Sequence, residues 1–225
     1  MIQALVLYLW IKQFVGATAS LTLSPSLAPT PAPSTSRSTK YSVSLFAGTG
    51  TSASTGTGGR ATSASFSNLR SVWLDTAGVV YVGESSANCV RSIDASGIVH
   101  SFAGICGSSG STDDGGAATS ALLKYCGTIF VSSTGNLYLS DNNNSKVRMV
   151  STSSTMSTVV GTGTGVNSGD GGKATSAGLN DPFGIWSNSV GTLYIECTLG
   201  QLIRSVDSSN IIRSFAGMRF IVSNT

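Results

Sequence analysis

A unit of about 56 residues recurs along this chain of 225 residues, and that period constrains the fold more than any other feature. The tripeptide Phe46-Ala47-Gly48 marks the period, because related tripeptides return after it at spacings of 56, 57 and 56. They are Phe102-Ala103-Gly104, Val159-Val160-Gly161 and Phe215-Ala216-Gly217. A fixed period of this length is typical of repeat proteins, in which each unit is one supersecondary element stacked on its neighbours.

Three further sequence features share this period. Each unit contains an Ala-Thr-Ser-Ala sequence after a pair of glycines, then a tyrosine, and then an arginine ten residues after the tyrosine. The Ala-Thr-Ser-Ala sequences begin at Ala61, Ala118 and Ala174, and the second glycines of the pairs are Gly59, Gly116 and Gly172. The tyrosines are Tyr81, Tyr138 and Tyr194, and the arginines are Arg91, Arg148 and Arg204. We interpret these positions as structural features of the repeat.

Each unit is predicted to contain four short strands separated by turns. In the first unit the strands cover residues 71–75, 79–84, 89–94 and 98–103. Gly78 and Gly97 mark the tight hairpins. A four-stranded meander cannot cover both of its faces alone, so neighbouring units must stack, and radial stacking of such sheets makes a β-propeller. The 27 glycines and the low charged fraction, 10%, agree with an all-β chain; a β-sandwich is the alternative fold.

Several short motifs of the second and third units occur together. They are Asp170 to Ala177, Leu179, Pro182 and Gly184, with Gly135 to Tyr138, Asp141, Val147 and Arg148. In combination they resemble NHL-repeat propellers over about residues 41–217. The resemblance implies a propeller that binds protein or nucleic-acid partners through loops at one end of the ring, and some relatives are metal-dependent lyases or hydrolases. The family's Pro-x-Gly sequence before the inner strand is intact only at Pro182-Phe183-Gly184.

The chain is predicted to have four regions. Residues 1–19 form an apolar segment that ends in small residues, which favours a cleaved signal peptide over a signal anchor or a misassigned start. Residues 20–40 hold all but one of the five prolines and are interpreted as an extended linker. The repeats follow at about 41–104, 105–161 and 162–217, and residues 218–225 are a tail. We therefore expect a secreted or extracellular protein.

The number of repeats leaves the two ends of the array open. Residues Tyr41 to Ala47 are predicted to form a lone outer strand, and three complete units follow. Three blades are too few to close a ring of the usual size, which favours either a truncated chain or a partial ring that pairs with a second copy. The faces that the array should bury carry Val72, Leu74, Ile129, Val131, Ile185 and Trp186. The faces at the two ends of the array would be exposed.

Acidic residues recur beside the glycine pairs and beside the repeated arginines. Asp114 and Asp170 precede glycines; we interpret them as caps of the Ala-Thr-Ser-Ala turns, with Ca²⁺ binding as the alternative. Glu84 is predicted to pair with Arg91 across a hairpin, and Asp141 with Arg148 in the same way. In the third unit Cys197 replaces the acid and Glu196 stands one position earlier, so no equivalent pair is expected there. A ring of arginines that binds an anion is the alternative interpretation.

Four cysteines and one histidine remain. The cysteines occupy non-equivalent positions, and in a secreted chain they permit two disulfides. We favour a bond between Cys106 and Cys126, which begin and end the same loop between units. His100 alone cannot supply a zinc site or a catalytic triad. No cofactor and no metal are expected.

The polar loops at the ends of the strands differ among the three units, as loops that recognise a partner would. We predict a non-enzymatic recognition or scaffold module that binds an unknown protein or glycan. The candidate binding residues are Glu84, Asn88, Asp141, Asn142, Asn143 and Glu196. Nucleic acid is not expected, because the net charge is only +3 and no basic stripe is present. The alternatives are a lyase or lactonase whose metal is held by Glu84, Asp141 and Glu196, and an inactive fragment of a longer ectodomain.

Overall fold

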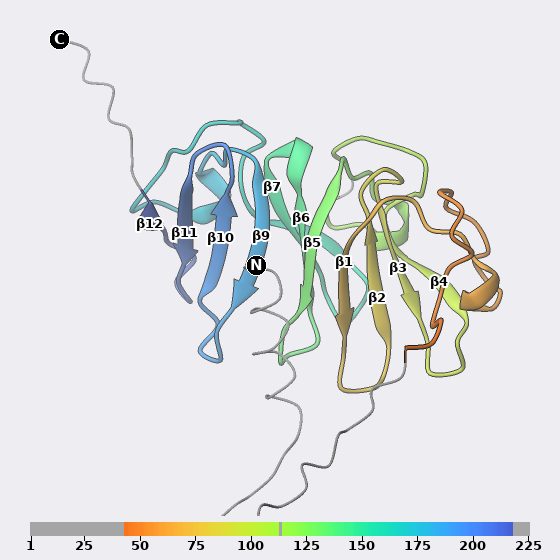
Figure 1. Cartoon of the computed structure of the whole chain (residues 1–225). Coiled ribbons are helices and arrows are strands. Elements are labelled where there is room, and N and C mark those ends of the chain that lie inside the picture. Colours follow the sequence, from red (N-terminus) through yellow and green to blue (C-terminus); the bar gives the residue numbers. More distant parts are fainter. Residues whose placement is uncertain (1–42, 113, 218–225) are drawn as a thin grey trace, which may run out of the picture. The chain divides into compact units, whose positions relative to one another are not determined.

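The computed structural model describes residues 43–112 and 114–217, and the described residues from Ser44 onward form one compact unit. Three antiparallel sheets of four strands follow one another along this unit (Figure 1). The first sheet contains β1 (Leu69–Leu74), β2 (Val80–Glu84), β3 (Cys89–Ile93) and β4 (Val99–Ala103). The second contains β5 (Cys126–Val131), β6 (Leu137–Asp141), β7 (Lys146–Val150) and β8 (Met156–Val160). The third contains β9 (Pro182–Ser187), β10 (Leu193–Cys197), β11 (Leu202–Val206) and β12 (Ile212–Gly217).

Each sheet is a meander in which consecutive strands pair, as the repeat predicts. Neighbouring sheets meet through their first two strands: β5 contacts β1 and β2, and β9 contacts β5 and β6. In Figure 1 the three first strands, β1, β5 and β9, accordingly stand next to one another. The all-β class is confirmed, and the sheets are packed as consecutive propeller blades.

An aspartate or asparagine side chain organises four of the hairpins. At the first one, Asp75 Oδ1 accepts the N–H groups of Ala77 and Val79, both at 2.9 Å. Gly78 follows with φ +82°, a left-handed conformation that glycine adopts without steric cost. The same two-bond pattern recurs at Asp94, Asn188 and Asp207. The hairpins predicted at Gly78 and Gly97 are therefore confirmed, with a local reason for each turn.

The Ala-Thr-Ser-Ala sequences fold into short 3₁₀ turns that join one blade to the next. These are η1 (Ala61–Ser63), η2 (Ala118–Ser120) and η4 (Ala174–Ser176), and each buries its alanine. The N–H of Gly104, just after β4, donates to Ala118 O at 2.9 Å, and that of Gly161, just after β8, donates to Ala174 O at 3.0 Å. No side chain caps these turns, so the predicted capping role of Asp114 and Asp170 is wrong.

Each blade presents an aromatic front face and an aliphatic back face. We define the front by a row of three side chains: Trp73, Tyr81 and Phe102, then Phe130, Tyr138 and Val159, then Trp186, Tyr194 and Phe215. The back of each blade carries Val72, Ile129 or Ile185 on its first strand. The front of the first blade packs on the back of the second, and the front of the second packs on the back of the third. The core therefore consists of repeated front-on-back interfaces.

Two expectations for the ends of the array have different outcomes. The lone outer strand predicted at Tyr41 to Ala47 is wrong for its described part, because residues 43–47 belong to no strand. Val72, Leu74 and Trp186 are exposed while Ile129 and Ile185 are buried, as expected for open end faces on either side of filled interfaces. The signal peptide, the linker and the tail lie outside the described residues.

Within those described ranges, no helix is long and apolar enough to cross a membrane.

Candidate functional site

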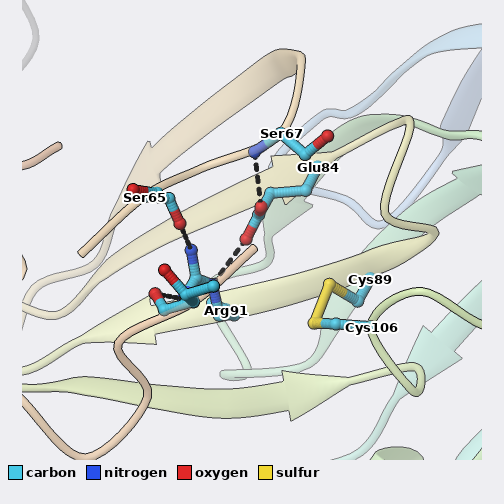
Figure 2. Close-up of a disulfide and its surroundings, with 7 residues drawn as sticks. Ser65, Ser67, Glu84, Cys89, Arg91 and Cys106 are labelled. Carbon is cyan, nitrogen blue, oxygen red and sulfur yellow. Dashed lines mark hydrogen bonds and ion pairs between the residues drawn. A yellow bond between two sulfur atoms is a disulfide. The ribbon is translucent and has the colours of Figure 1, made fainter. Parts of the chain in front are cut away.

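A buried arginine on the third strand of each blade ties a glycine-rich loop to the sheet. Arg91 Nε donates to Glu84 Oε1 at 2.5 Å, and its other nitrogens donate to the carbonyl oxygens of Thr55 and Ser65 (Figure 2). Both Arg91 and Glu84 are completely buried, and the second oxygen of Glu84 accepts the N–H of Ser67 at 2.7 Å. We call this arrangement, with its counterparts at Arg148 and Arg204, the arginine clamp.

The other two clamps use acids from different positions. Arg148 donates to Asp141 at 3.3 Å, as predicted, and also to Asp114 at 3.0 Å. Arg204 has no acid at the position of Cys197 and instead donates to Asp170 at 2.5 Å. Asp114 and Asp170 therefore act as partners of arginine, which corrects their assignment as turn caps. A hydrogen-bonded guanidinium satisfies the buried carbonyl oxygens of these loops, so each clamp is structural.

Burial of the clamp acids changes the role assigned to two candidate binding residues. Glu84 and Asp141 are completely buried, so neither carboxylate can contact a partner, and the expectation that they do is wrong. Burial raises the pKa of the Asp141 carboxyl, while hydrogen bonds from Asn144, from the Lys124 N–H and from Arg148 act in the opposite direction. In the alternative prediction, Glu84, Asp141 and Glu196 hold a metal ion. Two of these three ligands, Glu84 and Asp141, instead form buried ion pairs with arginines.

The disulfide joins Cys89 to Cys106, not Cys106 to Cys126 as predicted. Cys89 begins β3, and the chain turns back at Gly104 directly after β4, so Cys106 lies beside the start of β3, with the two Cα atoms 5.1 Å apart (Figure 2). Cys126 lies at the start of β5, where complete burial raises the pKa of its thiol. Among the described residues, one group of three possible metal ligands gathers, Glu84 with Cys89 and Cys106, and its two sulfur atoms are bonded to each other.

Reduction of this disulfide is expected to lower the stability of the chain by roughly 3 kcal/mol, because the bond closes a short loop in the unfolded state. Thermal unfolding with and without dithiothreitol measures the effect. Cys106→Ser should match the reduced wild type and no longer respond to the reductant. An unchanged melting temperature on reduction of the wild type would contradict the pairing.

A polar groove lies where the second and third blades meet at their loop ends. It has a volume of about 400 Å³. Its lining residues are Tyr125, Asn142, Asn143, Asp181, Phe183, Glu196 and Thr198, and we call them the rim groove. The structure thus brings together three of the six candidate binding residues, Asn142, Asn143 and Glu196.

Backbone geometry holds the walls of the rim groove. Tyr125 and Asp181 precede the inner strands of their blades in the left-handed conformation, with φ of +59° and +58°. Asn142 is buried and donates its side-chain N–H to Pro182 O at 3.1 Å, which connects the two blades. Asn88, another candidate binding residue, accepts the N–H of Tyr125 at 2.8 Å, so its amide orients the groove from outside.

The candidate binding residues predicted from the sequence did not include Tyr125, Asp181, Phe183 and Thr198, although Thr198 lies in the loop after Glu196. Tyr125 and Asp181 directly precede the broken and the intact Pro-x-Gly sequence of their units, and Phe183 is the middle residue of the intact one. This variation was the available signal. His100, by contrast, lies on the outer strand β4, where its exposed side chain pairs with that of Asp94 at 2.8 Å. It is not among the residues that line the groove.

Neither a known protein family model nor a curated protein matches the sequence. Solved structures do match. A protein of unknown function from Bacteroides thetaiotaomicron is 25% identical, with a TM-score of 0.51, and the match covers 57% of this chain and 32% of that one. An auxiliary nutrient binding protein from Bacteroides ovatus is 14% identical, with a TM-score of 0.50, and the match covers 68% of this chain and 37% of that one. Virginiamycin B lyase from Staphylococcus aureus is 14% identical, with a TM-score of 0.45, and the match covers 65% of this chain and 40% of that one.

The three stacked four-stranded sheets define a protein of the β-propeller class. The match spans between about a third and two fifths of the length of these three structures. Their names include a lyase and a binding protein, and at such low identity the likeness describes the fold alone. The function of this chain must therefore be argued from its own site.

Proposed function

We propose that this chain is an extracellular recognition module of the NHL type that binds a glycan in the rim groove. The observation that carries the proposal is the composition of the groove, which combines two aromatic rings with amide and carboxylate side chains outside the arginine clamps. Exposed Asn143, Glu196 and Thr198 can reach a ligand, and half-buried Tyr125 and Phe183 offer apolar walls.

This composition fits a sugar better than the other ligands considered. A sugar ring has an apolar C–H face that packs on an aromatic ring, and its hydroxyl groups both donate and accept hydrogen bonds. Carboxylates accept such bonds strongly, which suits Asp181 and Glu196. The same two carboxylates repel phosphate, so the groove does not favour nucleic acid. A glycan partner outside the cell also agrees with the disulfide, since disulfides persist in oxidising compartments.

The proposal is tested by applying the full chain to an array of extracellular glycans. The protein is made in a bacterial host so that the acceptor sequence Asn143-Asn144-Ser145 stays unmodified. We expect binding to at least one glycan class. Phe183→Ala and Glu196→Gln should each weaken it about tenfold, which corresponds to roughly 1.4 kcal/mol for a lost ring contact or charged hydrogen bond.

Val166→Ala serves as the control, because Val166 is an exposed apolar side chain outside the rim groove. It should leave glycan binding unchanged. Failure of the wild type to bind any glycan, or equal binding by wild type and both groove variants, would refute the proposal.

A further inference from the structure

No blade among the described residues covers the front face of the third blade. Trp186 stacks on Tyr194 with ring centroids 6.2 Å apart, and Phe215 meets Tyr194 edge-on at 5.0 Å. Trp186 is 50% exposed and Phe215 is 62% exposed. In the first two blades the equivalent row of side chains packs against the back of the following blade. An exposed apolar patch of this kind marks an interaction surface.

Among the described residues, the back face of the first blade is also largely open, and residues 44–47 lie over only part of it. Val72 is 66% exposed, whereas Ile129 and Ile185, its equivalents in the next two blades, are 1% and 5% exposed. A hollow of about 480 Å³ lies on this back face, and Val72, Val80 and Val82 contribute to its lining. The hollow is therefore the position where the front of a preceding blade would lie.

These two open faces are the two halves of one interface that the chain already makes twice. We propose that a second copy of this chain covers both: the front of the third blade of each copy packs on the back of the first blade of the other, around a two-fold axis. Each new interface repeats the chemistry of the internal ones, in which an aromatic row packs on aliphatic side chains and a 3₁₀ turn. The inference does not involve the rim groove and is independent of the proposed function.

The segment from Ser44 to Gly48 occupies part of the contact site and must move when the copies associate. The N–H of Gly48 donates to Ala61 O at 2.9 Å, the bond that Gly104 makes to Ala118 within the chain. Gly217 of the second copy holds the equivalent position in the repeat. The segment belongs to no strand, and Phe46 is 57% exposed, whereas Gly217 ends a paired strand. Association therefore replaces an irregular, partly exposed segment by the end of a paired strand.

Sedimentation velocity of the full chain tests the assembly. We expect a species of twice the mass of one chain. Trp186→Glu and Val72→Glu should each give monomers, because each places a charge in one half of every interface. Val166→Glu, in an exposed loop on neither face, is the matched control and should remain dimeric. Circular dichroism and cooperative unfolding establish that each variant is folded.

Mixing the two folded monomeric variants tests the head-to-tail arrangement itself. Trp186→Glu retains an intact back face and Val72→Glu retains an intact front face, so the mixture should form pairs through one undamaged interface while neither variant does so alone. Phe46→Gly should lower the dimer Kd several-fold, because it weakens the competing segment. A wild-type monomer, open-ended growth, failure of the mixture to pair, or a raised Kd for Phe46→Gly would overturn the proposal.

Discussion

Gly104→Val is expected to lower the free energy of unfolding by at least about 3 kcal/mol, as backbone strain and a steric clash add. Gly104 has φ +78°, a conformation that is costly for a β-branched residue. A Cβ atom there would lie 2.6 Å from Asn88 O and 3.0 Å from Leu123 Cδ1, between the start of β3 and the next blade. Gly161 occupies the equivalent place, and Gly161→Val should behave alike. Urea unfolding monitored by circular dichroism measures the loss.

Gly97→Val is the matched control for Gly104→Val. Gly97 has nearly the same φ, +77°, but a Cβ at this position would meet nothing within 4 Å. Gly97→Val should therefore lower the free energy of unfolding only by the cost of backbone strain, about 1 kcal/mol or somewhat more. Equal losses at the two positions would show that the packing between blades at Gly104 contributes nothing.

Arg91→Met is expected to destabilise the chain by about 3–5 kcal/mol, the usual effect of removing one partner of a buried ion pair. Methionine fills a similar volume but leaves the carboxylate of Glu84 without its cation, and it leaves two loop carbonyl oxygens without a donor. Denaturant unfolding at pH 7 gives the value. A second change, Glu84→Gln, should recover part of the loss, because it removes the unpaired charge and keeps an acceptor for the Ser67 N–H.

Arg213→Met provides the comparison at the surface. Arg213 pairs with Asp207 at 2.7 Å, but its side chain is 58% exposed, and water and salt screen such a pair. Its substitution should have little effect on unfolding. If Arg91→Met were equally mild, the arginine clamp would not hold the glycine-rich loop.

The period of the sequence was sufficient to predict the sheets, because turn residues and apolar positions recur at the same offsets in every unit. The hairpins at Gly78 and Gly97 depend on residues next to them in sequence, such as Asp75, and local signals of this kind are readable from one chain. The pairing of Glu84 with Arg91 was also predictable from their places on adjacent strands. Their complete burial was not, because it depends on a loop that folds back over the sheet.

The disulfide and the rim groove depend on how segments of one blade, and of neighbouring blades, lie next to one another in space. Cys106 and Cys126 bound one loop in the sequence, but the turn at Gly104 places Cys106 beside Cys89 instead. Tyr125 and Phe183 belong to different blades and line the same groove because β5 and β9 are neighbours. Such contacts follow from the packing of blades, which a periodic pattern does not describe residue by residue.

The arginine clamps have a consequence for the order in which the blades form during protein synthesis. Thr55, Thr112 and Ser168, whose carbonyl oxygens the clamps engage, each lie 36 residues before the arginine that binds them. When the third strand of a blade leaves the ribosome, the loop that its arginine must hold has therefore already been made. Each blade can fasten its own preceding loop without waiting for later sequence, so the array can be assembled from its amino-terminal end, one unit at a time.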